Sequence, residues 1–210
     1  MAIKVDALAP NFKAKTTQGD IDFYEWSGDS WVIFFTHPAD FTPVCTTELG
    51  TAARLKPEFD KRNVKSLGLS IDSLEDHALW VKDIEETQRV TMNFPVIADD
   101  EREISILYGM LHPFEMSNMA VRSVFVIDPN KRVRLSFTYP LSIGRNFTEI
   151  LRVIDALQLS DRCQVSTPAD WVQGEDVVIN TNISEDEIPA LFPKGYKKLN
   201  DYLRLTPQPD

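Results

Sequence analysis

Residues 37–48, HPADFTPVCTTE, are the part of the sequence best suited to chemistry, because they place Cys45 at the expected start of a helix. The preceding residues 31–36, WVIFFT, are apolar and rich in β-branched and aromatic side chains, which predicts a buried strand. Apolar residues then recur at helical spacing over residues 49–59. The segment is therefore predicted to turn from a strand into a helix, and the helix is expected to cover residues 43–61.

The order of residues in this turn favours a reactive thiol. Thr42 has the side chain of a helix N-cap, and Pro43 follows at the first helical position. Cys45 is then the third helical residue, where free N–H groups and the positive end of the helix dipole favour the nucleophilic thiolate. The Thr42 hydroxyl is expected to accept the N–H of Cys45, as in a capping box. The alternative, a small buried hydrophobic cysteine, fits poorly with neighbours that are prolines, threonines and acids.

The motif Pro38-x-x-x-Thr42-x-x-Cys45 resembles the peroxidatic motif of peroxiredoxins, and residues 37–48 together resemble the 1-Cys peroxiredoxins of the peroxiredoxin 6 type. The resemblance continues in order through residues 69–77, 121–127, 144–147, 149–153 and 202–209. It implies an α/β fold with a thioredoxin-like core and a small C-terminal domain. It also implies a thiol-dependent peroxidase that reduces hydrogen peroxide and organic (alkyl) hydroperoxides to water or alcohols.

The resemblance assigns roles to four residues. Cys45 would attack the peroxide and become a sulfenic acid. Thr42 would donate or relay a hydrogen bond to the peroxide, and Pro38 would shape the pocket and keep water from the sulfur. Arg122, which matches an arginine from a distant strand, would stabilise the thiolate and bind peroxide oxygen. Nothing local in the sequence singles out Arg122, which would otherwise be interpreted as a surface charge.

Three further residues are expected to support the site. Glu48 lies on the same predicted helical face as Cys45 and is expected to form a salt bridge with Arg145, which matches a second family arginine. His37 matches the family's active-site histidine. It is expected either to tune the thiol or bond the reductant, or to be a partly buried structural histidine, and the residues leave both open.

The second cysteine is interpreted as incidental. Cys163 stands in the sequence DRCQ, which does not resemble the Val-Cys-Pro setting of the resolving cysteine in two-Cys relatives. No Cys-x-x-Cys pair is present for dithiol exchange. The reductant must therefore be external: glutathione with a transferase, another small thiol, or ascorbate.

Other site types are not expected. His77 and His112 have no partners at ligand spacing in the sequence, so no metal site is predicted, and the resemblance implies no cofactor. Residues 28–32 resemble a Gly-x-Ser-x-Gly lipase segment but lack its last glycine. Because Tyr24 stands where the proposed lipase histidine would lie, lipase activity is expected to be absent or minor.

Composition limits the classes of partner. The chain has 210 residues, 43% of them hydrophobic, which suits one well-packed domain with a smaller appendage. A formal charge of −10 opposes binding to nucleic acid or to anionic membranes. Residues 1–6 contain no apolar signal core, and no stretch approaches the length of a membrane span. We therefore expect a cytoplasmic protein.

Alternating strand-like and helical segments predict a layered α/β domain over residues 1–165. Beyond Cys163 the composition shifts toward Pro, Asp and Glu, so residues 166–210 are predicted to form a small C-terminal domain, which in the resembled family helps form a homodimer and covers the active site. The expected strands are residues 64–71, 94–98, 121–127 and 133–139, the last two as a hairpin, and the expected helices are one capped by Ser73, residues 102–108 and residues 146–157.

A second class of function remains open on the same fold, because fold alone does not decide function. A peroxide sensor or a chaperone-like binding protein would share this architecture. A sensor would pass its oxidation to a partner protein, whereas an enzyme would turn over with a small thiol. The joint presence of Pro38, Thr42, Cys45 and Arg122 favours the enzyme.

Overall fold

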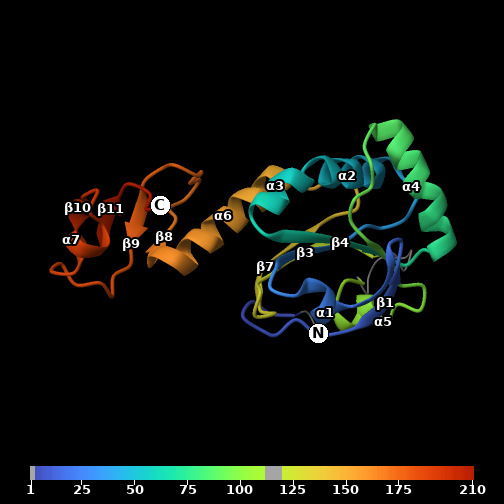
Figure 1. Cartoon of the computed structure of the whole chain (residues 1–210), viewed down its shortest axis with the longest axis horizontal. Helices are drawn as coiled ribbons and strands as arrows, with labels where there is room; N and C mark the ends of the chain where they lie inside the picture. The colour runs from blue at the N-terminus through green and yellow to red at the C-terminus, as the bar shows by residue number, and fades with distance from the viewer. Residues whose placement is uncertain (1–2, 112–119) are drawn as a thin grey trace. The chain divides into compact units, whose positions relative to one another are not determined.

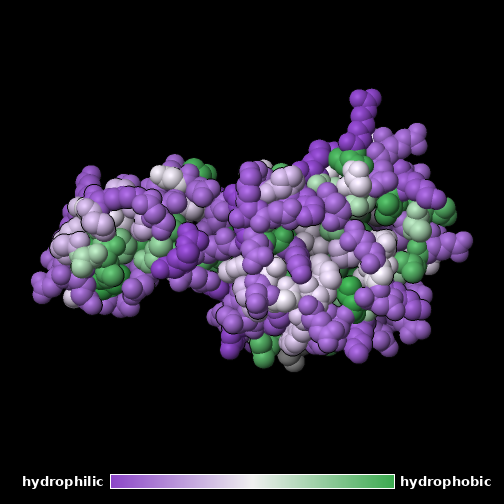
Figure 2. Space-filling model, in the orientation of Figure 1, coloured by the Kyte–Doolittle hydropathy of each residue, from purple (hydrophilic) through white to green (hydrophobic). Residues whose placement is uncertain are grey.

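The computed structural model describes residues 3–111 and 120–210 (Figure 1). Packing divides the chain into two units, Met1–Phe147 and Thr148–Asp210, and each is described by itself. On each unit, polar side chains make up most of the visible face, and small apolar areas lie among them (Figure 2). Within the described ranges, none of the helices combines the length and apolar character needed to span a membrane.

A mixed sheet forms the frame of the first unit. In the part of this unit that the structure describes, seven strands follow the order β2-β1-β5-β4-β3-β6-β7. The central strand β3 runs parallel to β4 and antiparallel to β6, and β6 forms a hairpin with β7. The strands are β1 (Lys13–Thr16), β2 (Gly19–Asp22), β3 (Trp31–Thr36), β4 (Val64–Ser70), β5 (Val96–Ala98), β6 (Arg122–Ile127) and β7 (Val133–Tyr139).

Helices cover both faces of this sheet (Figure 1). α2 and α3 lie over one face, and α1 and α5 lie over the other. α4 packs beside α2. The helices of the unit are α1 (Phe23–Ser27), α2 (Pro43–Arg54), α3 (Lys56–Lys61), α4 (Leu74–Gln88) and α5 (Glu103–Leu107).

Burial on both faces explains the continuous apolar sequence of β3. Because successive side chains of a strand point to opposite faces, Val32 and Phe34 face one side, and Ile33 and Phe35 face the other. Val32 and Phe34 belong to a cluster that also contains Phe23 of α1. All six residues of β3 are buried, as expected for a strand covered by helices on both sides. The strand therefore gives the loop that follows it a rigid anchor.

Several local predictions are confirmed, and others are wrong. The strand at residues 31–36, the hairpin of β6 and β7, and the Ser73 cap of α4 are present. The single helix over residues 43–61 is wrong, because α2 ends at Arg54 and α3 begins at Lys56. Pro57 explains the break, since proline lacks an N–H and fits only the first turn of a helix. The sequence reading also missed α1 and the hairpin of β1 and β2.

The second unit has its own small core. Residues 148–210 are all described, and they contain most of α6 (Phe147–Cys163), the short helix α7 (Ile188–Leu191) and a sheet of four strands in the order β10-β11-β9-β8. The strands are β8 (Val165–Ser166), β9 (Val177–Ile179), β10 (Lys197–Asn200) and β11 (Leu203–Thr206). Trp171, 1% exposed, is the largest side chain of the core. Packing places α6 from Thr148 onward with this unit, and the domain boundary near residue 165 stays a prediction.

We expect the sheet core to carry much of the stability of the first unit. Leu69 on β4 is fully buried, whereas Leu79 on α4 is 51% exposed. Leu69→Ala should lower the free energy of unfolding by about 3 kcal/mol, because it leaves a cavity. The matched change Leu79→Ala should alter it by less than about 0.5 kcal/mol. Urea unfolding followed by circular dichroism measures both, and equal losses would contradict the assigned core.

Candidate active site

Cys45 lies at the position that the sequence predicted, at the start of α2. Thr42 is the N-cap, Pro43 is the first helical residue, and Cys45 is the third and is fully buried. The expected capping bond is wrong: the Thr42 hydroxyl makes no cap bond and donates instead to the carbonyl of Ala39 at 2.9 Å. The turn brings this carbonyl within reach of the hydroxyl. With its proton used there, the Thr42 oxygen acts only as an acceptor toward any further group.

The loop between β3 and α2 contains one residue with a strained backbone conformation. Phe41, immediately before the N-cap, has a φ of 54°, a region that bulky residues rarely adopt, and its side chain is 53% exposed. The backbone N–H of Asp40 donates to the Asp72 carboxylate at 3.0 Å. Pro38 is buried within the loop. These contacts hold the loop against the end of the sheet.

Arg122, the first residue of β6, reaches the sulfur of Cys45. Its Nη1 lies 3.4 Å from Sγ and also donates to Oε2 of Glu48 at 2.5 Å. Its Nε donates to the carbonyl of Leu141 at 2.9 Å. Arg122 is only 3% exposed, so these bonds keep the guanidinium in one orientation. β6 lies beside β3 in the sheet, which explains how a residue so distant in sequence arrives here.

The expected pair of Glu48 and Arg145 is present. The backbone N–H and Nε of Arg145 donate to Oε1 of Glu48 at 2.7 and 2.9 Å, and Nη2 donates to Oε2 at 2.6 Å. Nη1 of Arg145 donates to the carbonyl of Thr36, at the end of β3. The guanidinium also lies over the ring of Phe35, 4.9 Å from its centre. Glu48 therefore holds two arginines, and Arg145 ties the cluster to the central strand.

The charges in this cluster favour an anion at the sulfur. Burial by itself raises the pKa of Glu48, but the charge and hydrogen bonds of Arg145, with the charge of Arg122, more than offset burial and lower it. One carboxylate then faces two guanidinium groups, which leaves one buried positive charge in excess. The arrangement is therefore that of a buried sulfur with a cationic donor beside it.

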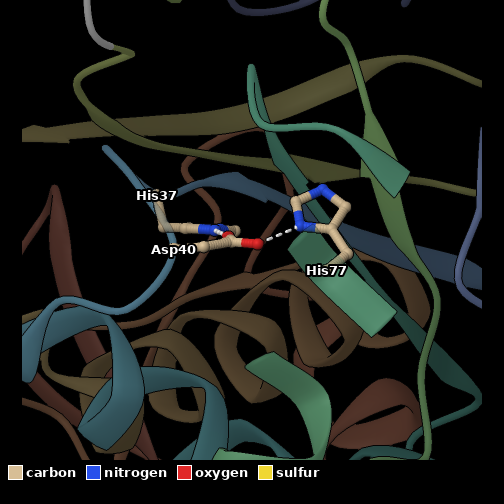
Figure 3. Close-up of side chains that lie close together, drawn as sticks. All are labelled: His37, Asp40 and His77. Atoms are coloured by element: carbon tan, nitrogen blue, oxygen red, sulfur yellow. Dashed lines mark hydrogen bonds and ion pairs between the residues drawn. The ribbon is translucent and has the colours of Figure 1, made fainter. Parts of the chain in front are cut away.

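A second buried cluster lies in the same loop. The Asp40 carboxylate sits between the rings of His37 and His77 (Figure 3). Oδ1 lies 2.7 Å from Nε2 of His37, and Oδ2 lies 2.5 Å from Nδ1 of His77. The expectation that His77 is isolated is wrong, because folding places α4 against this loop. His112 lies outside the described residues, and the absence of a metal site stays a prediction.

The ring of His37 is enclosed by its neighbours. It is fully buried and packs against Trp80, with ring centres 4.9 Å apart, and Trp80 in turn donates to the Thr46 hydroxyl beside Cys45. Sequence reasoning missed the roles of Asp40 and His77. Signals were available, because Asp40 follows His37 by three residues and His77 lies one turn after the predicted Ser73 cap.

Two weaker expectations concern other nucleophiles. Cys163 is half-buried in the second unit, and both cysteines are free thiols. The Ser30 hydroxyl donates to the side-chain oxygen of Asn63 at 2.8 Å, and an amide cannot act as a general base. Tyr24 donates its hydroxyl to the carbonyl of Ala9. The incidental role of Cys163 stays a prediction, and so does lipase activity that is absent or minor.

Comparisons with known proteins all indicate the same protein family. Residues 5–136 match the AhpC/TSA family, and residues 156–192 match the C-terminal domain of 1-Cys peroxiredoxin. A 1-Cys peroxiredoxin of Dictyostelium discoideum is 51% identical over 208 residues, which cover 99% of this chain and 86% of that protein.

Solved structures agree over the full length. The C45S mutant of the peroxiredoxin 6 of Arenicola marina superimposes with a TM-score of 0.94 at 43% identity, and covers 100% of both chains. A yeast mitochondrial 1-Cys peroxiredoxin, described with a thiol resolving mechanism via glutathione/thioredoxin systems, gives a TM-score of 0.92 at 50% identity, covering 98% of this chain and 99% of that one.

These matches confirm the predicted fold class, a thioredoxin-like α/β core followed by a C-terminal 1-Cys peroxiredoxin domain. They also confirm the resemblance to the peroxiredoxin 6 type, since the identity is about half over nearly the whole chain. The chain belongs to the 1-Cys peroxiredoxins, and it is a thiol-dependent peroxidase.

Proposed function

We propose that Cys45 is the peroxidatic residue and that Arg122, Thr42 and Pro38 form its peroxide site. The observation that carries this proposal is the 3.4 Å contact between Nη1 of Arg122 and Sγ of Cys45. Both groups are buried, and Glu48 holds the guanidinium in place. A thiolate at a helix start, beside a fixed cation, has the setting that reactive cysteines share.

The reaction at this site is a displacement at oxygen. A lone pair of the Cys45 thiolate attacks one peroxide oxygen, the O–O bond breaks, and its electron pair leaves with the second oxygen. That oxygen takes up a proton and departs as water or, from an alkyl hydroperoxide, as an alcohol. Cys45 is oxidised to the sulfenic acid as the peroxide is reduced. Arg122 lowers the barrier because its positive charge faces the oxygen on which negative charge develops.

Thr42 and Pro38 orient the peroxide and exclude water. Because the Thr42 hydroxyl donates to Ala39, its oxygen is available to accept the O–H of the attacked peroxide. Of the two expected roles of Thr42, donating or relaying a hydrogen bond, this supports the relay, because the hydroxyl accepts from the peroxide while it donates to Ala39. Pro38, buried in the same loop, offers no N–H and helps to keep water from the sulfur.

Glu48 and Arg145 support Arg122 rather than the peroxide. Glu48 receives bonds from both arginines, and Arg145 anchors Glu48 to the carbonyl of Thr36. The guanidinium of Arg122 is therefore oriented before the reaction begins. No free energy is then spent on reorganising it during the reaction. His37 lies in the same loop as Pro38 and Thr42 and contacts Asp40 and Trp80.

An external thiol restores Cys45. One thiol displaces water from the sulfenic acid and forms a mixed disulfide, and a second thiol attacks that disulfide and releases the reduced cysteine. Glutathione with a transferase, or another small thiol, supplies both equivalents, and ascorbate is the remaining candidate. The yeast relative described with glutathione/thioredoxin systems supports a thiol. Cys163 plays no part in this proposal.

We also propose a homodimer in the cytoplasm. The resembled family uses its C-terminal part in a dimer, and this chain carries that part. β7 is the last strand of the sheet as far as the described residues show. Two free thiols suit a reducing compartment. The net charge of −10 suits a protein whose partners are peroxides and small reductants rather than nucleic acid or membrane.

The alternative is a peroxide sensor or a chaperone-like binding protein on the same fold. The buried arginine beside Cys45 favours the enzyme, because a fixed donor at the leaving oxygen accelerates reduction of small peroxides. Repeated turnover with a small thiol separates the two functions. A sensor would stop after one oxidation and would need a protein partner to continue.

The first experiment mixes the reduced protein with one equivalent of hydrogen peroxide. We expect fast, stoichiometric loss of peroxide and a sulfenic acid at Cys45, detected by mass spectrometry. Cys45→Ser should abolish the reaction, and the matched variant Cys163→Ser should keep it unchanged. A rate no faster than that of free cysteine would contradict activation of Cys45 and favour the binding protein.

Removal of the Arg122 guanidinium should slow peroxide reduction. Arg122→Met should lower the second-order rate constant by about 100- to 1000-fold, the usual loss for one preorganised donor. Arg122→Lys should recover part of it, because lysine keeps the charge but not the fixed fork. Stopped-flow tryptophan fluorescence measures the constants, and circular dichroism verifies folding. A loss below about threefold in the folded Arg122→Met variant would refute the role.

Acid should lower the free energy of unfolding, because it protonates Glu48. Its folded pKa is lowered, so its contribution to stability is present above its unfolded pKa of about 4.3 and is lost as the pH falls through the folded pKa. Glu48→Gln should destabilise the protein by about 3 to 5 kcal/mol at pH 7, because two buried arginines lose their counter-charge. It should also flatten the pH dependence of unfolding in acid.

The control for this prediction is Glu58→Gln. Glu58 also pairs with two cations, Lys61 and Arg62, but Glu58 and Lys61 are exposed to solvent and only Arg62 is partly buried. Surface pairs contribute little, so urea unfolding at pH 7 should show little change. Equal effects of the two substitutions would contradict the special role of the buried carboxylate.

A further inference from the structure

The geometry of the cluster of His37, Asp40 and His77 limits where its hydrogens can lie. Nε2 of His77 lies 3.0 Å from the carbonyl of Ile97, which can only accept, so Nε2 carries a hydrogen. Nδ1 lies 2.5 Å from the Asp40 carboxylate, a contact that requires a second hydrogen. Two acceptors at that distance would repel each other. The contact therefore contains one hydrogen, which we place on Nδ1, so that the pair is an imidazolium at His77 and a carboxylate at Asp40.

The electrostatic environment supports this assignment. Burial lowers the pKa of His77, but the hydrogen bond and charge of Asp40, the bond to Ile97 and the charge of Asp72 raise it overall. Burial raises the pKa of Asp40, but hydrogen bonds from both histidines lower it overall. The groups that face the pair are His37 from the same loop and Asp72 from the loop after β4.

His37 is the neutral member of the cluster. Burial lowers its pKa and outweighs the opposing effects of Asp40 and Asp72, with the positive His77 acting in the same direction as burial. A neutral imidazole has one hydrogen, and Nε2 must carry it because Nε2 faces the Asp40 carboxylate at 2.7 Å. Nδ1 is then a bare acceptor. It is buried and has no hydrogen-bond partner among the described residues.

We propose that Asp40 and His77 are positioning residues that hold His37 as a neutral Nε2–H imidazole, with Nδ1 presented as an acceptor in the active-site loop. Asp40 orients the ring, and His77 supplies the positive charge that Asp40 would otherwise draw from His37. Without His77, the nearest group able to neutralise Asp40 is His37, which would take a second proton and change Nδ1 from acceptor to donor.

The role in the cycle follows from what His37 meets there. Peroxides, thiols and a sulfenic acid all carry a hydrogen that they can donate. A buried acceptor without a hydrogen-bond partner, such as Nδ1 of His37, costs free energy until such a donor binds to it. His37 packs on Trp80, which bonds Thr46 beside Cys45, so the ring is coupled to the start of α2. This use of His37 rests on the proposed function of Cys45, whereas its protonation state does not.

A metal ion in this cluster is the competing explanation. The ligand-type atoms of His37, Asp40 and His77 all lie within 4.8 Å of one another. Tetrahedral zinc, with bonds of about 2.0 to 2.1 Å, separates its ligand atoms by roughly 3.3 Å. The separations of 2.5 and 2.7 Å are those of hydrogen bonds. These contacts therefore fit hydrogen bonds between the three side chains better than bonds to a shared metal ion.

Nuclear magnetic resonance of protein labelled with 15N in its three histidines tests the proposal. Long-range 1H–15N spectra distinguish an imidazolium from each neutral tautomer, and His37→Gln and His77→Gln assign the signals. In the reduced, chelator-treated protein at pH 7, we expect His77 as an imidazolium and His37 as the neutral Nε2–H form. In His77→Gln the pKa of His37 should rise by about 1 to 3, and its Nδ1 should become protonated.

Asp40→Asn provides a second variant, in which both histidines should be neutral at pH 7 because the counter-charge is gone. The pH profile of peroxide turnover in His77→Gln should shift with the new pKa of His37. A neutral His37 with Nε2–H in His77→Gln would overturn the proposal. So would one equivalent of Zn²⁺ that binds and shifts the signals of both His37 and His77. If the Cys45 assignment is wrong, the unsubstituted protein and the histidine variants will reduce peroxide no faster than free cysteine, whereas the expected spectra stay the same.

Discussion

The buried carboxylate of Glu48 holds two guanidinium groups from distant parts of the chain, and the rest of the site depends on this contact. Arg122 comes from β6, and Arg145 comes from the loop after β7. Through Arg145 the cluster reaches the carbonyl of Thr36, so α2, β3 and β6 meet at one carboxylate. Its single charge cannot balance both arginines. The remaining positive charge, on Arg122, lies beside the sulfur of Cys45.

The loop between β3 and α2 contains a second cluster built by the same physical rule. There Asp40 stands between two histidines, as Glu48 stands between two arginines. The outcome differs because histidine can lose its proton and arginine cannot. In the proposed assignment, Asp40 is balanced by His77 alone, and His37 stays neutral. The loop between β3 and α2 thus lies between two clusters. The cluster around Glu48 has an excess positive charge, and the cluster around Asp40 is neutral.

Sequence reasoning succeeded where the signal was local. The apolar run of β3, the Thr42–Pro43 helix start and the Ser73 cap depend on neighbouring residues, and the structure contains all three. It failed where a competing local effect was overlooked, as with the proline that ends α2 early. The Thr42 hydroxyl shows a different failure, because a loop carbonyl competes with the helix N–H, and only the folded turn decides which one it meets.

The sequence by itself determined that Cys45 is the third residue of a helix, because a cap, a proline and an apolar period are properties of adjacent residues. Resemblance added Arg122, but no local pattern could place its guanidinium at the sulfur, 77 residues away. That contact exists because β3 and β6 pair antiparallel. Likewise, His77 meets Asp40 across 37 residues only because α4 packs beside the loop. Charges in a buried site act over space, and only the tertiary structure decides which of them are neighbours.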